Sequence, residues 1–243
     1  MKAIILAAGK STRLYPITLE NPKCMLQVGD KKIIDHQISW LRQCNVTDIL
    51  VVTGYLNHMI ESHLIDSYLN EDVRFIHYPN YENTNNLATL YSVRDKLNDD
   101  VVILFSDVLL SVNLLYKCIN SSDNICLIVD PKNITDKTMR VVIHDDFIAD
   151  IGGHIPVEQA DANFIGVAKF SVDAAHDLVV KMGELLRDDT CLHDYYTIAL
   201  RDFSAFDSKV SYIEVDQDPW VEIDTVEDYR LIQLDGIDLP SLL

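Results

Sequence analysis

Four cations lie within the first 23 residues of this 243-residue chain, and their spacing suits phosphate binding. Lys2, Lys10, Arg13 and Lys23 are opposed there only by Glu20, so the segment contributes +3 to a formal net charge of −18 and the other residues contribute −21. A guanidinium group can bind two phosphate oxygens at once, and an ammonium group acts as a point charge. An acidic chain thus concentrates positive charge where an anionic substrate would need it.

Small residues stand among these cations, directly after an apolar run. Ala7, Ala8 and Gly9 follow residues 2–6, whose branched apolar side chains are typical of a buried strand. Because such residues carry little or no side chain, backbone N–H groups can approach a nucleotide base or phosphate closely. The strand end and its cations together predict a nucleotide-binding loop.

The composition argues against several other kinds of protein. An acidic surface would repel a nucleic-acid backbone or an anionic membrane, and the apolar runs are far shorter than the roughly 18 residues of a membrane helix. No glycines fit the dinucleotide motif G-x-G-x-x-G, and Ile4 stands where a P-loop ending at Gly9 needs its first glycine. The five cysteines form no C-x-x-C pair, which disfavours a zinc site. The apolar run 3–8 is too short for a secretory signal, so a cytoplasmic protein is expected.

Strands and helices must alternate to position these groups. The expected strands are 2–6, 49–53, 74–77, 101–105 and 125–129, and the expected helices are 33–44 and 87–97. This alternation predicts an α/β fold with a Rossmann-like three-layer α/β/α arrangement and a mainly parallel mixed sheet. Ligands bind such sheets beyond the carboxyl ends of the strands.

The second half of the chain has a different order of expected strands and helices. Strands are expected at 139–144, 147–151 and 164–170, with no long helix between the first two, which predicts a small antiparallel β insertion. A helix at 171–186, a strand at 212–215 and a helix at 225–234 complete the chain. Without a repeat or a linker, we expect one domain, 1–243, with halves of about 1–130 and 131–243.

A longer motif contains the N-terminal cations: Leu6-Ala7-Ala8-Gly9-Lys10-Ser11-Thr12-Arg13-Leu14-x-Pro16-x-Thr18, followed by Pro22-Lys23. It resembles the opening signature of the nucleotidyltransferases that activate phosphorylated sugars and alcohols, L-A-A-G-x-G-x-R-L-x-P-x-T and then P-K. Ser11 replaces the second glycine, which predicts a tighter or slightly shifted phosphate loop. The nucleotide-binding residues that the resemblance implies are Leu6, Ala7, Ala8, Gly9, Lys10, Ser11, Thr12, Arg13, Lys23, Tyr78, Asn85, Asn86 and Asp107.

Two acidic segments are similar to the same family. Asp107 follows an expected strand, and Asp224 lies in a segment, 222–229, that resembles the family's E-I-D-x-x-x-D-Y. The resemblance implies that these two carboxylates hold the catalytic Mg²⁺, an ion that prefers oxygen ligands. It also implies that Arg13 binds the β and γ phosphates and that Lys23 stabilises charge at the α phosphate or the acceptor. Taken singly, each aspartate could instead be a helix cap or a solvated charge.

Three further segments resemble one branch of the family, the cytidylyltransferases that act on phosphocholine and on phosphonates such as 2-aminoethylphosphonate. They are residues 79–86, 89–92 and 163–170. Tyr78 stands where the family often has asparagine, so the contacts that recognise the nucleotide base are expected to differ from those of the family. The halves of the domain are then a nucleotide-binding half and an acceptor-binding half.

The candidate acceptor site, chosen for the chemistry of its residues, contains aromatic rings, carboxylates and two cations: Arg140, Lys169, Asp194, Tyr195, Tyr196, Trp220 and Glu222. Aromatic faces and carboxylates suit a cationic head group such as choline, whereas the two cations suit a phosphonate or a carboxylate. Core packing of the rings and surface exposure of the cations are the alternatives.

The expected function is therefore that of a Mg²⁺-dependent cytidylyltransferase, which transfers CMP from CTP to a small phosphorylated alcohol or phosphonate and releases pyrophosphate. Two alternatives stay open: a sugar-1-phosphate nucleotidyltransferase that uses UTP or dTTP, and a non-catalytic regulatory subunit with the same fold. Joint retention of the two cations and two aspartates argues against the second. The expected partners are CTP and the acceptor, without nucleic acid or membrane, and a homodimer is left open.

Overall fold

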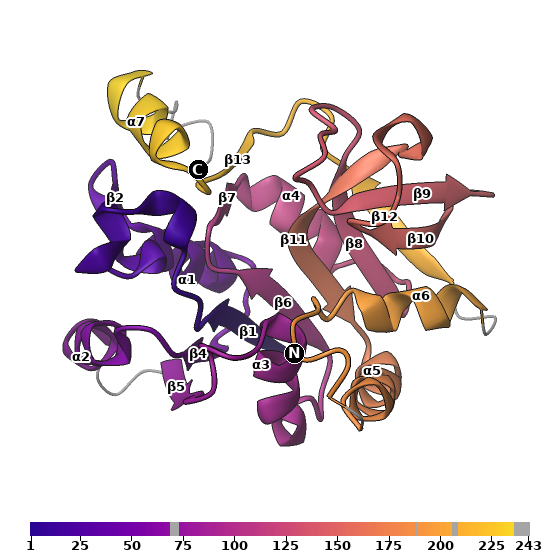
Figure 1. Cartoon of the computed structure of the whole chain (residues 1–243), viewed down its shortest axis with the longest axis horizontal. Coiled ribbons are helices and arrows are strands. Elements are labelled where there is room, and N and C mark those ends of the chain that lie inside the picture. The colour runs from indigo at the N-terminus through magenta and orange to yellow at the C-terminus, as the bar shows by residue number, and fades with distance from the viewer. Residues whose placement is uncertain (69–72, 188, 206–208, 236–243) are drawn as a thin grey trace.

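The computed structural model describes residues 1–68, 73–187, 189–205 and 209–235. Its centre is a nine-stranded sheet in which β10, β9, β11, β6, β1, β4 and β5 are successive neighbours, while β8 joins β11 to β12 (Figure 1). The strands are β1 (Lys2–Ala7), β4 (Asp48–Thr53), β5 (Val73–His77), β6 (Val101–Phe105), β8 (Ile125–Asp130), β9 (Arg140–His144), β10 (Phe147–Gly152), β11 (Ala162–Phe170) and β12 (Val210–Glu214).

The sheet changes direction at β11. Strands β5, β4, β1 and β6 are parallel, whereas β11 pairs antiparallel with β6, β8 and β9. Every expected strand is present, and most of their ends agree within about two residues. The predicted Rossmann-like fold with an antiparallel insertion is therefore confirmed.

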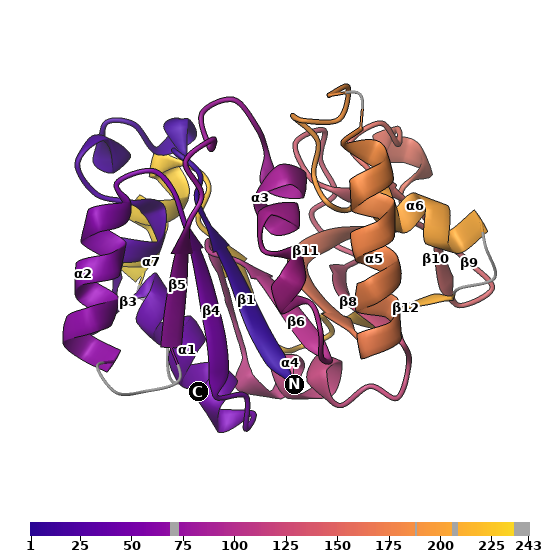
Figure 2. The same cartoon turned by 90° about the horizontal axis from the view of Figure 1, so that it is seen from below.

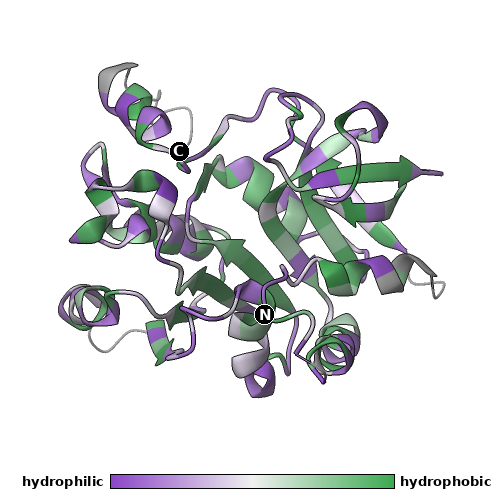
Figure 3. Ribbon diagram, in the orientation of Figure 1, coloured by the Kyte–Doolittle hydropathy of each residue, from purple (hydrophilic) through white to green (hydrophobic). Residues whose placement is uncertain are grey.

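Helices cover both faces of the sheet. They are α1 (Ile33–Gln43), α2 (Asn57–Tyr68), α3 (Asn86–Ser92), α4 (Val112–Ile119), α5 (Val172–Leu185), α6 (Ile198–Ala205) and α7 (Val226–Asp235). Apolar residues of α1, α2 and α4 share one core with Ala3 and Ile5, whereas those of α3, α5 and α6 share the other with Ile4 and Leu6. This alternation along β1 places apolar side chains in both layers. Figure 2 shows α3 beside α5, and Figure 3 shows apolar residues concentrated in the strands.

One expected helix is shorter in the structure, and three helices, α2, α4 and α6, were not expected. The helix expected at 87–97 ends at Ser92, and a single 3₁₀ turn, Arg94–Lys96, follows Val93. Helix α2 has only two fully buried side chains, Ile60 and Leu64, so the sequence carries a weak apolar period there. Within the described ranges, none of the helices has the length and apolar character needed to cross a membrane.

A small ribbon outside the main sheet joins distant parts of the chain. Strand β7 (Val108–Leu110) pairs antiparallel with β13 (Trp220–Glu222), so that Glu222 lies opposite Val108. The pairing continues by one hydrogen bond, from the N–H of Ile223 to the carbonyl of Asp107 at 3.1 Å. The C-terminal acidic segment is thereby held against the end of β6.

Candidate active site

In the loop after β1, Ser11 has a backbone conformation typical of glycine, the residue that the family motif has at this position. Ser11 adopts φ 51° and ψ 52°, the left-handed conformation that glycine tolerates best. Its carbonyl accepts a hydrogen bond from Oγ1 of the buried Thr18 at 2.9 Å. The Ser11 backbone therefore keeps a conformation that suits glycine, and Thr18 fixes it.

The end of β4 holds the same loop from the other side. The N–H of Tyr55 donates to the carbonyl of Ala8 at 3.0 Å. A Cβ at Gly54 would lie only 2.5 Å from that carbonyl oxygen, so the close approach requires glycine. Small residues on both strands thus leave room beside the loop.

A cavity of about 420 Å³ opens beside this loop. Of the predicted nucleotide-binding residues, it is lined by Leu6, Ala7, Ala8, Gly9, Lys10, Ser11, Thr12, Arg13, Lys23, Asn85, Asn86 and Asp107. Tyr78 does not line it. That residue is buried, and its hydroxyl is 3.0 Å from Oγ1 of Thr84, which does line the cavity.

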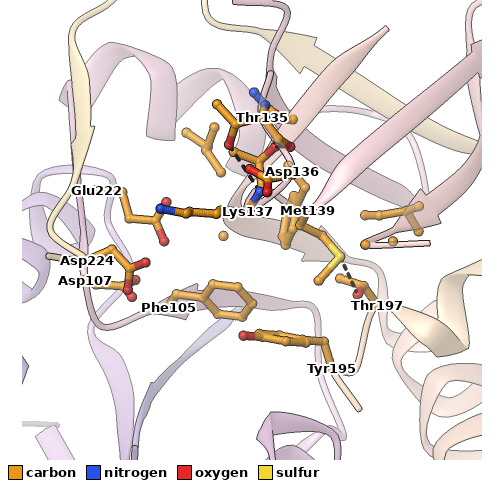
Figure 4. A pocket seen from close by; sticks show the side chains of 18 of the residues that line it. Phe105, Asp107, Thr135, Asp136, Lys137, Met139, Tyr195, Thr197, Glu222 and Asp224 are labelled. Carbon is orange, nitrogen blue, oxygen red and sulfur yellow. Dashed lines mark hydrogen bonds between the residues drawn. The ribbon is translucent and has the colours of Figure 1, made fainter. Parts of the chain in front are cut away.

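Three carboxylates meet beside this cavity, and two of them, Asp107 and Asp224, line it. Oxygen atoms of Asp107, Glu222 and Asp224 lie within 4.8 Å of one another, and Figure 4 shows the three side chains on one side of the neighbouring pocket. Lys23 joins two of them, since its Nζ lies 2.9 Å from Oδ2 of Asp107 and 3.1 Å from Oδ1 of Asp224. Arg13 pairs with the other oxygen of Asp224. The two N-terminal cations therefore offset part of the charge of an acidic cluster whose members come from distant parts of the chain.

The electrostatics of this group follow from its crowding. Burial opposes the charge of Lys23, but attraction to Asp107 and Asp224 outweighs it and raises the lysine pKa above its usual value. Although Glu222 is an exposed residue, desolvation by the cavity wall and repulsion from the two aspartates raise its pKa to about 7. Within the described part of the chain, the buried Oδ1 of Asp107 has no hydrogen-bond partner. The cluster thus has more carboxylate oxygens than the nearby cations satisfy.

Two residues outside the cluster hold its aspartates in place. Nε2 of the buried Gln37 on α1 donates to the carbonyls of Phe105 and Val108, both at 2.8 Å, and so brackets the turn that carries Asp107. Oδ2 of Asp228 accepts hydrogen bonds from the N–H groups of Asp224 and Thr225 at 3.0 and 2.7 Å. Asp228 is the second aspartate of the E-I-D-x-x-x-D-Y segment, and these hydrogen bonds show that it caps the start of α7.

A larger cavity, of about 1050 Å³, adjoins the first. Both are lined by Arg13, Phe105, Asp107, Tyr195 and Asp224, so they meet at the carboxylate cluster. In Figure 4 the rings of Phe105 and Tyr195 lie along one wall, and residues 135–139 form the opposite one. Because each cavity contains residues from both halves of the chain, the site depends on the whole domain.

The predicted acceptor-binding residues divide into two groups. Asp194, Tyr195, Trp220 and Glu222 line the larger cavity. Tyr196 does not line it, because its ring is fully buried in the core and packs edge to face against Phe105. Glu222 also belongs to the carboxylate cluster, a position that the sequence did not indicate for it.

Arg140 and Lys169 were expected to bind an acceptor anion, but the structure places both outside the cavity lining. The buried guanidinium of Arg140 donates to the carbonyls of Thr135, Gly153 and Ile155. It therefore braces two loops that form the cavity wall. Nζ of Lys169 donates to the carbonyls of Ser121 and Asp123, at 3.2 and 2.6 Å, near the opposite end of β11. Backbone carbonyls satisfy both cations.

Other lining residues were not anticipated. They include Phe105, Lys137, Met139, His154, Gly166 and Arg201. Most come from strands or loops whose sequences are typical of core or surface segments. Only the folded structure shows that they line one cavity. Gly166 carries the one usable signal, because it interrupts an apolar strand pattern.

The fold and this site define an enzyme that transfers a nucleotidyl group. The family model described as nucleotidyl transferase matches residues 2–138, more than half of the chain, and the protein belongs to that family. The match covers the nucleotide loop, β6 and Asp107. The expected family is confirmed.

Similar proteins point to one branch of the family. The CTP:phosphoglutamine cytidylyltransferase of Campylobacter jejuni is 28% identical, with 95% of this chain and 98% of that protein covered. The choline-phosphate cytidylyltransferase of Streptococcus pneumoniae is 29% identical, with 96% and 97% covered. A solved structure of CTP:phosphocholine cytidylyltransferase from Streptococcus pneumoniae superposes with a TM-score of 0.81 at 26% identity, covering 96% of this chain and 97% of that one. The expected likeness to cytidylyltransferases is therefore confirmed.

Proposed function

We propose that this enzyme transfers CMP from CTP to a small phosphorylated alcohol or phosphonate and releases pyrophosphate. CTP is assigned to the smaller cavity and the acceptor to the larger one. The observation that carries the proposal is the contact of Lys23 with both Asp107 and Asp224, at the point where the two cavities meet. A cation and a carboxylate cluster at that boundary lie where an acceptor oxygen would attack the α phosphorus.

Positioning and charge neutralisation dominate such a transfer, because the attacking oxygen is already anionic near neutral pH. Arg13 leaves Asp224 to bind the β and γ phosphates, for which its planar guanidinium is suited. Lys23 stabilises charge that develops at the α phosphate. The backbone of residues 7–11 surrounds the nucleoside, since the small residues Ala7, Ala8 and Gly9 allow a close approach.

The carboxylate cluster fits a divalent cation such as Mg²⁺. Three carboxylates converge there, and Oδ1 of Asp107 is buried without a hydrogen-bond partner among the described residues. Asp107 and Asp224 would hold the ion, with Glu222 beside them, in an oxygen environment that Mg²⁺ prefers. When bound, the ion supplies positive charge that stabilises the phosphate oxygens of the transition state.

The acceptor is selected in the larger cavity. Asp194 and the ring of Tyr195 offer a carboxylate and an aromatic face on one wall, which favours a head group with a positive charge. The full-length relatives act, by name, on phosphoglutamine and on choline phosphate. We therefore place the acceptor among small phosphorylated compounds with an amino or ammonium group. The net charge of −18 argues against a nucleic acid or an anionic membrane as a partner. We place the reaction in the cytoplasm.

Pyrophosphate release with Mg²⁺ tests this function. CTP, UTP, ATP, GTP and dTTP are each combined with phosphocholine, 2-aminoethylphosphonate, phosphorylated glutamine and glucose 1-phosphate. Release with CTP and one of the first three acceptors is the expected result. Release only with glucose 1-phosphate and UTP or dTTP would move the enzyme to the sugar-activating branch. Nucleotide binding without turnover on any acceptor would support the non-catalytic alternative.

A further inference from the structure

The start of α3 is joined to a distant segment, residues 192–196, by a group of hydrogen bonds that we call the clamp. The clamp consists of Asn85 N–H to the Leu192 carbonyl (2.7 Å), Asn85 Nδ2 to the His193 carbonyl (3.2 Å), Leu87 N–H to the Asp194 carbonyl (3.2 Å) and Tyr196 N–H to Oδ1 of Asn86 (2.7 Å). About 110 residues separate its two sides.

The clamp uses groups that a helix terminus leaves without internal partners. The first N–H groups of an α-helix have no carbonyl acceptor within the helix. In α3, the N–H groups of Asn85 and Leu87 find such acceptors in the segment 192–194. Residues 189–197 form turns with no regular helix or strand of their own. Their position therefore depends strongly on the clamp.

Tyr195 is the residue that this arrangement places. It lines both cavities, is 38% exposed, and its ring centroid lies 6.3 Å from that of Phe105. The clamp holds its two neighbours, Asp194 through its carbonyl and Tyr196 through its N–H. The backbone on each side of Tyr195 is thus fixed to α3. Its ring, which lines both cavities, lies near that of Phe105 on one side of the larger pocket (Figure 4).

We propose that Asn86 is a positioning residue for the acceptor: by accepting the Tyr196 N–H, it keeps Tyr195 at the cavity boundary and so sets acceptor selection. The sequence had suggested that Asn86 binds the nucleotide. Asn86 does line the smaller cavity, and its Oδ1 accepts the backbone N–H of Tyr196, in the acceptor segment, at 2.7 Å. This inference rests on the proposed function for the identity of the two cavities.

Three variants and two readouts test the role of Asn86. Asn86→Leu removes the acceptor oxygen, Asn86→Asp keeps one in the same place, and Ser92→Ala is the matched control on the same helix, since its hydroxyl bonds only to the Thr89 carbonyl of α3 among the described contacts. Steady-state kinetics give separate KM values for CTP and for the acceptor. Hydrogen exchange of a peptide that covers 192–197 reports the clamp without turnover.

In Asn86→Leu, the acceptor KM should rise about tenfold, which corresponds to about 1.4 kcal/mol, and it should rise more than the KM for CTP, because Asn86 lines the smaller cavity but its Oδ1 holds the acceptor segment. Asn86→Asp should restore the acceptor KM to near the wild-type value, and Ser92→Ala should leave both KM values unchanged. Exchange at 192–197 should be faster in Asn86→Leu alone. A purely structural role would not give this split between substrates or the rescue by aspartate.

The inference is overturned if Asn86→Leu raises the KM for CTP alone, or raises both KM values equally. If the wild-type enzyme turns over no acceptor, the proposed function fails, and the exchange measurement still decides on the clamp. Unchanged exchange at 192–197 in Asn86→Leu would then overturn the positioning role by itself.

Discussion

The ammonium group of Lys23 contacts Asp107 at 2.9 Å and Asp224 at 3.1 Å. The three residues are far apart in the chain: Lys23 lies in the connection after β1, Asp107 follows β6, and Asp224 precedes α7. Lys23 is thus the internal counter-ion of two carboxylates. Substrate phosphates and a divalent cation would compete for the same three groups. The proposed function therefore requires that the lysine move its interaction from carboxylate to phosphate when CTP binds.

Replacing Lys23 by methionine should reveal this exchange. The variant leaves the carboxylates without their buried cation, so its stability should fall by about 3 kcal/mol and its turnover by about 10²-fold or more. Because Mg²⁺ can then replace the missing charge, added Mg²⁺ should raise the melting temperature of the variant more than that of the wild type. Lys31→Met, on the separate strand β3 (Lys31–Lys32), is the control. Equal responses to Mg²⁺ would contradict the counter-ion role.

Asparagine at position 107 or 224 should abolish metal-dependent turnover. Each change removes one charged oxygen ligand but keeps the shape of the side chain, so we expect a rate loss of about 10²-fold or more with an intact fold. The checks are turnover at saturating CTP and acceptor, circular dichroism, and binding of Mn²⁺ by electron paramagnetic resonance. Asp216→Asn, an exposed change before β13, is the control. Normal Mn²⁺ binding by both variants would remove these residues from the metal site.

Ser11→Gly should stabilise the protein without loss of activity. A left-handed conformation costs a non-glycine residue about 1–2 kcal/mol, whereas glycine loses about 0.5–1 kcal/mol more conformational entropy on folding. The net gain should therefore lie between about 0 and 1.5 kcal/mol by chemical denaturation. Asn45→Gly, at another left-handed position (φ 61°), should gain less, because asparagine tolerates this conformation better than serine does. A loss of stability in Ser11→Gly would mean that the serine side chain stabilises the loop.

The parts of the site that the sequence indicated follow central strands of the sheet. Arg13 and Lys23 follow the first strand, and Asp107 follows another central strand, so a parallel sheet places all three at one edge. Asp224 was found only by its likeness to a family segment. Its meeting with Asp107 depends on the β7–β13 ribbon, which joins segments about 110 residues apart and whose short strands carry little sequence signal.

Arg140 and Lys169 show why the acceptor site was harder to predict. A cationic side chain within an apolar strand suggests a binding site for an anion. The sequence does not show which backbone carbonyls will accept its hydrogen bonds in the folded chain. Both side chains are buried and satisfied by backbone oxygen atoms. Conversely, Phe105 and Met139 read as core residues, and only the folded chain places them in a cavity wall.

Gly166→Ala should disturb the acceptor cavity specifically. Gly166 has φ 89°, and an added Cβ would lie 2.7 Å from Cδ2 of Phe105, whose ring forms part of the wall. We expect a loss of about 1–3 kcal/mol in stability and a larger fall in kcat/KM for the acceptor than for CTP. Gly153→Ala is a matched control, because it lines the same cavity and its Cβ would meet no described atom within 4 Å. Equal kinetic effects of the two changes would argue against a role of the Phe105 ring.

Asp218 should make the stability of the β7–β13 region depend on pH. Burial opposes its ionisation, but hydrogen bonds from Lys117, Asn113 and Ser111 outweigh that effect and hold the pKa of Asp218 below its usual 3.8. These bonds fasten the segment before β13 to the start of α4. A carboxyl group with a lowered pKa stabilises the fold above its unfolded pKa, and this contribution is lost as the pH falls through the folded value.

Asp218→Ala should therefore lower the free energy of unfolding by about 2 kcal/mol at pH 7. As the pH falls below 3.8, the wild type begins to lose the part of this contribution that depends on the charge of Asp218, so the difference between the two proteins should narrow. Urea denaturation of both proteins between pH 7 and pH 3 measures the difference, and Asp216→Ala at the exposed neighbouring site gives the background. A difference that stayed constant over this range would mean that Asp218 acts through packing and not through its charge. Because the same segment leads into Glu222 and Asp224, the destabilised variant should also bind Mn²⁺ more weakly at pH 7.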